Sequence, residues 1–358
     1  PRSSSAASDV YKRQVQGNFA IGQNFGGFVS DFVRVGLYGV VFMGVTAFIV
    51  SGGIQHGIER AAKILMPSLL TIIFFLVVYS FTLPNAMKGL EFYLVPDFSK
   101  INGEVIYSAL GQAFFSLSLG MGALITYGSY VSEKENVIHS AAMITLTDVG
   151  IAFIAGLMIF PFVFYQGIEP SGGAGLIFAT LPGVFETLGP VLGIVIGSLF
   201  FLLLSFAALT STVSLLEVPV CYIVDEHNIP RKKAVWMIAG FIFVIGIPSL
   251  LANGASAFFS NFTNYIGIAP TTDFMTFIGY VANDTFLPLG GLLITFFAAY
   301  KWRKENLSAE IARGFEGYEG SFVQSFINFA VSYLCPALLG IIFILTVLNR
   351  FFGITLIG

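Results

Sequence analysis

Charged side chains are scarce in this sequence. Asp, Glu, Lys and Arg make up 10% of its 358 residues, whereas a soluble domain carries about 25% of them. The formal net charge of −3 excludes the strongly basic surface that a nucleic-acid-binding protein uses. The two cysteines, Cys221 and Cys335, both lie in apolar segments. They are expected to be buried thiols, with no disulfide framework and no cysteine metal site.

Apolar residues are abundant instead. Hydrophobic residues make up 56% and aromatic residues 15% of the chain, and the mean hydropathy is +0.85. A helix needs about 20 mostly apolar residues to cross a bilayer. The pattern predicts an all-α integral membrane protein with eight transmembrane helices, near residues 35–54, 64–83, 105–131, 137–163, 191–224, 233–252, 276–300 and 323–352.

The ends of the chain differ from this apolar body. Residues 1–14, PRSSSAASDVYKRQ, are polar and lack the apolar core of a signal peptide. We expect a non-native leader at 1–14, a single transmembrane domain at 15–352 that lacks its upstream part, and a C-terminal tail at 353–358. Lys and Arg concentrate in the loops that hold Arg60, Lys232 and Arg303, which the positive-inside rule places in the cytoplasm.

Histidine is scarce as well, with three residues in the chain. His56, His139 and His227 all lie at or near the cytoplasmic ends of the predicted helices. A membrane enzyme would need a paired nucleophile and base, or metal ligands, at membrane depth. The sequence therefore predicts a protein that is not an enzyme and that uses no organic cofactor.

One predicted helix carries small and polar residues at its centre. Residues 114–122 read FFSLSLGMG, with Ser116 and Ser118 next to Gly120 and Gly122. Glycine costs about 1 kcal/mol relative to alanine in a helix interior. Either the small residues let another helix approach closely, or the helix is interrupted and its unwound backbone lines a cavity.

A carboxylate lies near the middle of the next predicted helix, in TLTDVGIAFIAG. Placing Asp148 there costs about 2.5–3.5 kcal/mol on insertion scales, and no Lys or Arg lies near it in sequence. Its partner is either a bound cation or, for a protonated Asp148, a hydrogen-bonding group of another helix.

A third polar patch lies in SFAALTSTVSLLEVP, with hydroxyls at Thr210, Ser211, Thr212 and Ser214. Hydroxyl and carbonyl oxygens suit alkali cations, although Ser and Thr also bond the carbonyl one turn earlier in their own helix. Oxygen-rich patches at one depth in several helices are typical of secondary transporters, which bind substrate and coupling ions at the bilayer midplane.

These stretches resemble the neurotransmitter:sodium symporter family in its bacterial branch. The resemblance rests on GIERAAKILMP (57–67), GQAFFSLSLGMGALITYGSYV (111–131), GLIFATLPGVF (175–185), AALTSTVSLLEVPVCYIVDE (207–226) and LPLGGLLI (287–294). It implies a fold of two inverted five-helix repeats, in which the eight helices are the fourth to the eleventh. The implied sixth helix is the broken one, which favours an interruption at FFSLSLGMG.

The resemblance also assigns roles to residues. It implies a substrate site formed by Phe115, Ser116, Ser118, Met121, Ser211 and Leu215. A first sodium ion would bind Ser116 and Asp148, and a second would bind Thr210, Ser211 and the carbonyl of Ala207. The carboxylate of Asp148 would replace the chloride that many animal members use.

Gate residues follow from the same resemblance. Gln112 and Asp273 would belong to the external gate, with Asp284 as a rival to Asp273. Asp225 would belong to the internal gate, which Tyr130 borders.

The implied protein is a sodium-coupled symporter in the bacterial inner membrane. It would take up a small zwitterion, an amino acid, together with two sodium ions by alternating access, independently of chloride. Two other functions remain open. In a proton-coupled transporter Asp148 would carry the proton, and a membrane sensor on this fold would bind its ligand without transport.

Overall fold

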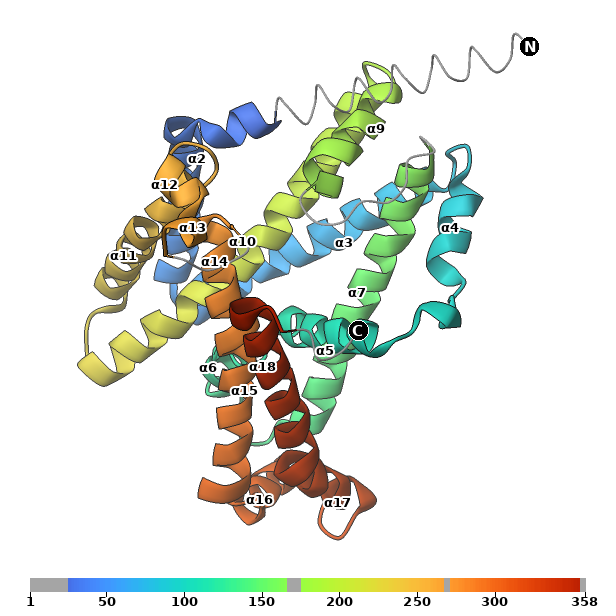
Figure 1. Cartoon of the computed structure of the whole chain (residues 1–358). Coiled ribbons are helices and arrows are strands. Elements are labelled where there is room, and N and C mark those ends of the chain that lie inside the picture. Colours follow the sequence, from blue (N-terminus) through green and yellow to red (C-terminus); the bar gives the residue numbers. More distant parts are fainter. Residues whose placement is uncertain (1–24, 166–174, 267–270, 355–358) are drawn as a thin grey trace. The chain divides into compact units, whose positions relative to one another are not determined.

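The computed structural model describes residues 25–165, 175–266 and 271–354 (Figure 1). Within these ranges the chain is helical and contains no β-strand. The leader expected at 1–14 lies outside the described residues, as does most of the tail expected at 353–358. Helices satisfy their backbone hydrogen bonds internally, which hydrocarbon requires because it offers no water as a partner.

Seven helices in the described part are long and apolar enough to cross a membrane. They are α2 (Phe32–Ser51), η1–α3 (Ile54–Ser80), α7 (Val137–Tyr165), α10 (Leu192–His227), α11 (Arg231–Leu251), α14–η4–α15–η5 (Phe274–Lys301) and α17–η6–α18 (Phe322–Phe352). The eighth expected span, 105–131, is not one continuous helix. It consists of α5 (Gly103–Ser116) and α6 (Ala123–Gly128), with a non-helical segment between them.

Short helices occupy the connections between these spans. They are α4 (Ala86–Leu94), η2 (Phe98–Lys100), η3 (Leu176–Thr180), α9 (Leu181–Thr187), α12 (Ala257–Ser260), α13 (Phe262–Ile266) and α16 (Lys304–Gly314). No soluble domain was expected between the spans, and the described connections contain only these short elements.

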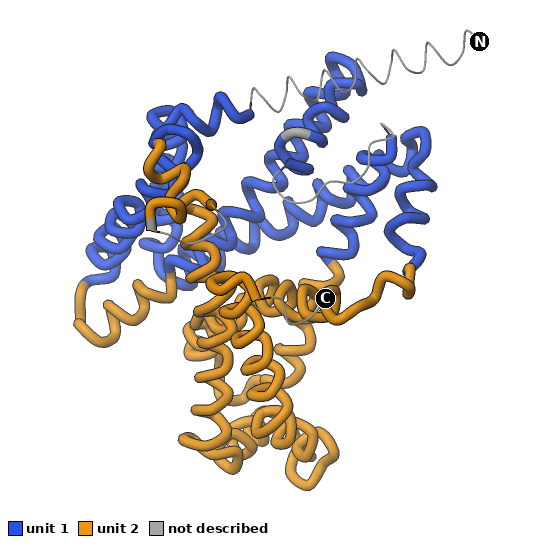
Figure 2. Tube along the Cα trace, in the orientation of Figure 1, with its two compact units in different colours: residues 1–96, 151–216, 230–256 blue, residues 97–150, 217–229, 257–358 orange. Residues whose placement is uncertain are grey.

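The chain divides into two compact units (Figure 2). Unit 1 comprises residues 1–96, 151–216 and 230–256, and unit 2 comprises residues 97–150, 217–229 and 257–358. Two long helices, α7 and α10, contribute residues to both units.

An apolar core formed by α3 (Arg60–Ser80), α7, α9 and α10 holds unit 1 together. Phe162 and Phe185 meet edge to face, with ring centroids 5.6 Å apart. α2 lies along α11 (Figure 1), and Nε of Arg231 donates to the carbonyl of Val50 at 3.1 Å, near the end of α2. The core also contains the fully buried side chains of Leu76, Val163, Leu181 and Val184.

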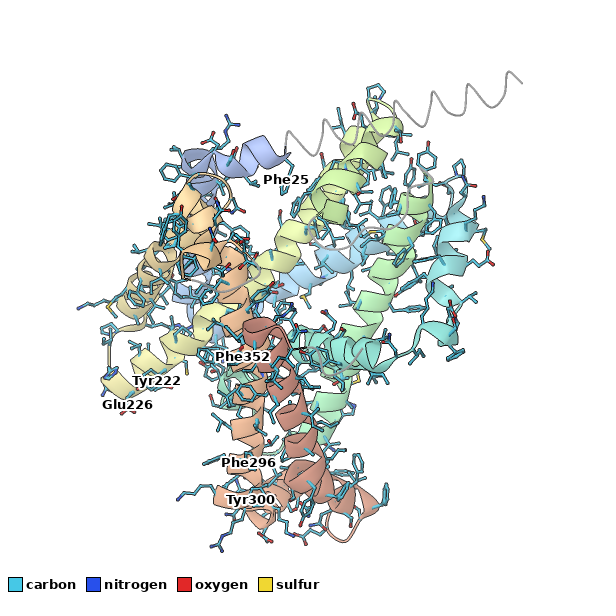
Figure 3. The ribbon with its side chains drawn as sticks, viewed as in Figure 1. Phe25, Tyr222, Glu226, Phe296, Tyr300 and Phe352 are labelled. Carbon is cyan, nitrogen blue, oxygen red and sulfur yellow. The ribbon has the colours of Figure 1, made fainter. Side chains whose placement is uncertain are left out.

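In unit 2, α15 (Leu287–Phe296) lies beside α18 (Cys335–Phe352) (Figure 1). Both spans contain π-helical turns, namely η4 (Tyr280–Phe286), η5 (Phe297–Lys301) and η6 (Ala330–Leu334). The rings of Phe296 and Tyr300 lie 5.8 Å apart on one span (Figure 3). The Tyr300 hydroxyl donates to the carbonyl of Ser332 on the other span at 2.7 Å, which ties the two π-helical turns together.

Gly156 of α7 leaves room for Tyr93 of α4. A Cβ at position 156 would lie 2.7 Å from Cε1 of Tyr93 and closer still to its hydroxyl end, which donates to the carbonyl of Phe153. We expect Gly156→Ala to lower the free energy of unfolding by about 1–3 kcal/mol, because overpacking strains both helices. Thermal unfolding of the purified protein in detergent measures this change.

Gly150→Ala on the same helix is the matched control. Its added methyl group meets nothing within 4 Å, and alanine favours the helix by about 1 kcal/mol over glycine. Equal unfolding midpoints for the two variants would contradict the expected clash at Gly156.

Candidate functional site

The segment FFSLSLGMG interrupts its helix. α5 ends at Ser116 and α6 begins at Ala123. Between them Ser118, Gly120 and Gly122 have positive φ angles of 52°, 83° and 82°. A right-handed helix cannot continue through residues in this left-handed region, which glycine adopts at low cost. Of the two interpretations of the sequence, the structure shows the interruption.

The last residue of α5 meets the carboxylate of α7. Oγ of Ser116 donates to Oδ2 of Asp148 at 2.7 Å, and both residues belong to unit 2. No Lys or Arg pairs with Asp148 among the described residues. A hydroxyl group stabilises a carboxylate without neutralising its charge. The two residues predicted to bind the first sodium ion therefore lie together, with oxygen atoms that suit a hard cation.

The hydroxyl patch of α10 forms mostly local hydrogen bonds. The hydroxyl of Thr210 donates to the carbonyl of Ala207 at 2.9 Å, so two residues of the predicted second sodium site are in contact. Ser214 donates to the carbonyl of Thr210 at 3.1 Å. Thr212 lies 3.1 Å from the buried Thr46 of α2, hydroxyl to hydroxyl. Ser211 is exposed, and its hydroxyl remains accessible.

None of the predicted substrate residues is fully buried in its unit. Phe115 exposes 49% and Leu215 exposes 47% of its surface, and Ser118 and Met121 are half-buried. In unit 2, Phe115 lies in the last turn of α5, and Ser118 and Met121 lie within the interruption, whereas Ser211 and Leu215 lie on the part of α10 that belongs to unit 1.

A polar cavity of about 310 Å³ lies beside α5 in unit 2. Its lining includes Gln112, Phe115 and Asp284. Nε of Arg350 donates to Oδ2 of Asp284 at 2.8 Å, and its guanidinium carbon lies 4.6 Å from the ring centroid of Tyr280. The arginine thus neutralises the carboxylate and rests on an aromatic face.

Asp273, the other candidate for the external gate, serves as a helix cap. Its Oδ1 accepts from the amide of Thr276 at 2.9 Å, and its Oδ2 accepts from the hydroxyl of the same residue at 2.7 Å. It precedes α14 (Phe274–Gly279) as the N-cap, a position that carboxylates favour. The structure therefore places Asp284, and not Asp273, in the cavity with Gln112.

An apolar cavity of about 330 Å³ lies on another side of the interruption. Its lining includes Ser118, Gly120, Gly291, Leu339 and Cys335. Cys335 is a free, half-buried thiol. The unwound backbone is thus in contact with hydrocarbon-like surroundings on this side.

At the other end of α6, Tyr130 bonds a buried carboxylate. Its hydroxyl donates to Oε1 of Glu217 at 2.8 Å, and Glu217 is 0% exposed. Sγ of Cys221 donates to Oδ2 of Asp225 at 3.2 Å. Glu217, Cys221 and Asp225 are spaced four residues apart and share one face of α10. Tyr130 and Asp225 are both predicted at the internal gate. Tyr130 therefore contacts the face of α10 on which Asp225 lies.

Sequence reasoning missed Glu217. The signal was present, because SLLEVPVC places a lone carboxylate inside an apolar run, as TLTDVGIA does for Asp148. An ionisable residue within a transmembrane segment is a functional candidate by default. Sequence reasoning also missed Arg350 as the partner of Asp284, and no local pattern indicates a contact between residues so far apart in the chain.

Removing the tyrosine hydroxyl tests the buried hydrogen bond. We expect Tyr130→Phe to lower the free energy of unfolding by about 1–3 kcal/mol, because a buried carboxylate loses a donor. Thermal unfolding in detergent measures this loss. Tyr222→Phe, near the exposed end of α10 (Figure 3), is the control, and an equally small effect of both variants would argue against the bond.

Comparisons with known proteins identify the family of this chain. A family model described as the sodium:neurotransmitter symporter family matches residues 3–350. The uncharacterized sodium-dependent transporter YhdH of Bacillus subtilis is 35% identical over 327 residues, which cover 90% of this chain and 69% of that relative. An uncharacterized sodium-dependent transporter of Haemophilus influenzae is 43% identical over 217 residues, covering 60% of this chain and 47% of the relative.

A solved structure is similar as well. The crystal structure of MhsT in complex with L-phenylalanine aligns with a TM-score of 0.78 and 38% sequence identity, covering 90% of this chain and 70% of that chain. The family consists of secondary transporters, so the resemblance and the prediction that the chain is not an enzyme are confirmed. With its apolar helices, the chain is part of a multi-pass membrane protein, and it belongs to the sodium:neurotransmitter symporter family.

Proposed function

We propose that the protein containing this chain is a sodium-coupled symporter that takes up an amino acid by alternating access. The contact of Ser116 with Asp148 at the interruption carries this proposal. It places a carboxylate and a hydroxyl beside unwound backbone in a membrane helix. The names of the relatives, which describe sodium-dependent transporters, and the L-phenylalanine in the MhsT complex support it.

We infer that the described helices correspond to the fourth to the eleventh helices of the family fold. The interrupted pair α5 and α6 would then be the sixth, and α10 the eighth. The coverage of 70% of the MhsT chain is in line with this correspondence. The bacterial relatives favour the inner membrane of a bacterium as the location.

The first sodium ion would bind at Ser116 and Asp148. Asp148 would supply a full negative charge. Ser116 would direct its hydroxyl hydrogen away from the ion and offer it an oxygen lone pair. Charge balance within a low-dielectric site is strongly favourable. Because the carboxylate is fixed to the protein, no chloride ion is needed to supply the compensating charge.

The second sodium ion would bind Thr210, Ser211 and the carbonyl of Ala207. In the structure Thr210 donates its hydrogen to that carbonyl. A bound cation would require Thr210 to release the carbonyl, so that both oxygens face the ion. Rotation of one side chain is a small change, and the hydrogen bond holds both oxygens close together until sodium arrives.

The substrate would lie against the interruption. Phe115 would cover it, and Ser118 and Met121 would line the pocket; the resemblance adds Ser211 and Leu215 of α10 to the substrate residues. Backbone groups at half-helix ends bind the carboxylate of an amino acid in transporters of this kind. The exposed apolar surfaces of Phe115 and Leu215 favour substrates with an apolar side chain.

Gates would close on either side of this site. On the outside, Gln112 and the pair of Asp284 with Arg350 line the same cavity, and Asp273 caps the helix that leads to it. On the inside, Tyr130 donates to the buried Glu217, and Asp225 lies two turns further along the same helix, where it accepts from Cys221.

Uptake by the complete gene product in proteoliposomes tests the proposal. We expect a mixture of radiolabelled amino acids to accumulate with an inward sodium gradient and not with a potassium gradient. Asp148→Asn should raise the half-saturating sodium concentration at least tenfold, because the cation loses a full charge. Accumulation driven equally well by a pH gradient in sodium-free buffer would point to proton coupling through Asp148. Sodium-independent binding without accumulation would indicate a sensor.

Replacement of chloride tests the role of the fixed carboxylate. We expect equal uptake in chloride and in gluconate at the same sodium concentration, because Asp148 already supplies the negative charge. Initial uptake rates in the two salts provide the measurement. Strong dependence on chloride would mean that Asp148 does not replace that ion.

A further inference from the structure

The motif LPLGG at residues 287–291 borders both cavities of unit 2, but no role has yet been assigned to it. Leu287, Gly290 and Gly291 stand at positions i, i+3 and i+4, so they share one face of α15. Leu287 and Gly291 are buried on this face. Two of its three residues have no side chain, which lets another backbone approach closely.

The unwound segment packs directly on this face. A Cβ on Gly120 would lie 2.9 Å from the amide nitrogen of Gly291 and closer still to the carbonyl oxygen of Leu287. A Cβ on Gly290 would lie 2.6 Å from the carbonyl oxygen of Gly120. Real Cβ atoms do not come so close, and the neighbours are backbone atoms that no rotamer change can move. Gly120 and α15 are therefore in backbone-to-backbone contact.

Gly291 provides a second point of support, against α5. A Cβ at position 291 would lie 2.8 Å from Cε1 of Phe114, in the last turn of α5. Phe114 lies next to Phe115 and four residues before Ser118. Its ring thus fixes the end of α5 that presents Ser116 to Asp148.

We propose that Gly290 and Gly291 are positioning residues for the first sodium ion and the substrate. Together they form a surface without side chains on α15, called the seat, which supports Gly120 of the unwound segment and Phe114 of α5. An unwound segment lacks the hydrogen-bond ladder of a helix, so its shape depends on what it packs against. Binding groups must be held within about 0.5 Å of their productive positions. The inference rests on the proposed function, because it concerns the site where sodium and substrate would bind.

The two glycines are expected to respond differently to an added methyl group. At position 290 the methyl meets a backbone oxygen, and the unwound segment itself must shift. At position 291 it meets the end of a side chain, and a smaller residue at position 114 relieves the overlap. Phe114→Leu is therefore expected to rescue Gly291→Ala and not Gly290→Ala.

Uptake of the radiolabelled amino acid mixture by the complete gene product tests this inference. Uptake is measured against mixture concentration and against sodium concentration, and rates are normalised to the amount of protein that elutes as a single species. We expect Gly290→Ala and Gly291→Ala to raise both half-saturating concentrations about tenfold or more. The double variant Gly291→Ala/Phe114→Leu should return to within about threefold of Phe114→Leu alone.

Gly340→Ala in α18 is the matched control, because its methyl group meets nothing within 4 Å. A merely structural role of the seat would reduce the amount of folded protein and leave the half-saturating concentrations of the remainder unchanged. That result, or no difference between Gly290→Ala, Gly291→Ala and Gly340→Ala, would overturn the inference while the proposed function stands. Absence of sodium-driven uptake by the wild type would overturn both.

Discussion

Unwound backbone inside a bilayer depends on cover from neighbouring protein, because hydrocarbon offers no hydrogen-bond partner. Residues 117–122 meet this constraint through the close contact of Gly120 with α15 and the packing of Phe114 against Gly291. The arrangement of unit 2 follows from it. α15 must present glycines at the point of contact, and α18 packs beside α15. The free-energy cost of the interruption is then reduced. The polar groups at Ser116 and Ser118 stay available for binding, whereas a continuous helix would use its backbone polar groups in its own hydrogen bonds.

Three carboxylates in membrane helices of unit 2 are bonded by a residue from another element. Asp148 receives the hydroxyl of Ser116, Glu217 receives the hydroxyl of Tyr130, and Asp284 receives the guanidinium of Arg350. The difference between these partners matters. A hydroxyl stabilises a carboxylate and leaves its charge in place, whereas an arginine cancels it. Asp148 can therefore serve a mobile cation, while Asp284 is already balanced within the protein.

From the residues alone the interruption was one of two interpretations, and the resemblance favoured it; Gly120 and Gly122 adopt the left-handed backbone at low cost, whereas Ser118 does not. The oxygen-rich patches were predictable, because polar residues are conspicuous in apolar runs. The register of the span that carries Asp273 and Asp284 could not be predicted from the sequence. A π-helical turn such as η4 (Tyr280–Phe286) shifts the helix relative to the count of 3.6 residues per turn. Such turns depend on tertiary packing, so counting from LPLGG does not show which aspartate faces the cavity.

The support that α15 gives to the interruption was also hidden in the sequence, although LPLGG was recognised as part of a motif. Glycine pairs in membrane helices indicate a close approach, but they do not say which segment approaches. The partner, Gly120, lies far away in the chain, and only the folded unit brings the two together. Glu217 was hidden for a different reason. It follows Thr210, Ser211 and Ser214 in the sequence, and these hydroxyl residues already account for a polar patch, whereas Asp148 lies in a more apolar stretch.

Cys335 stands beside this contact, in the wall of the apolar cavity that also includes Gly120 and Gly291. The sequence contains one other cysteine, Cys221, which lies on α10 next to Asp225. With Cys221 replaced by serine, a fluorine or spin label on Cys335 would be attached in the wall of the cavity that the unwound backbone also lines. The chain thus supplies its own reporter position, from which opening and closing of the site can be followed spectroscopically without introducing a new thiol.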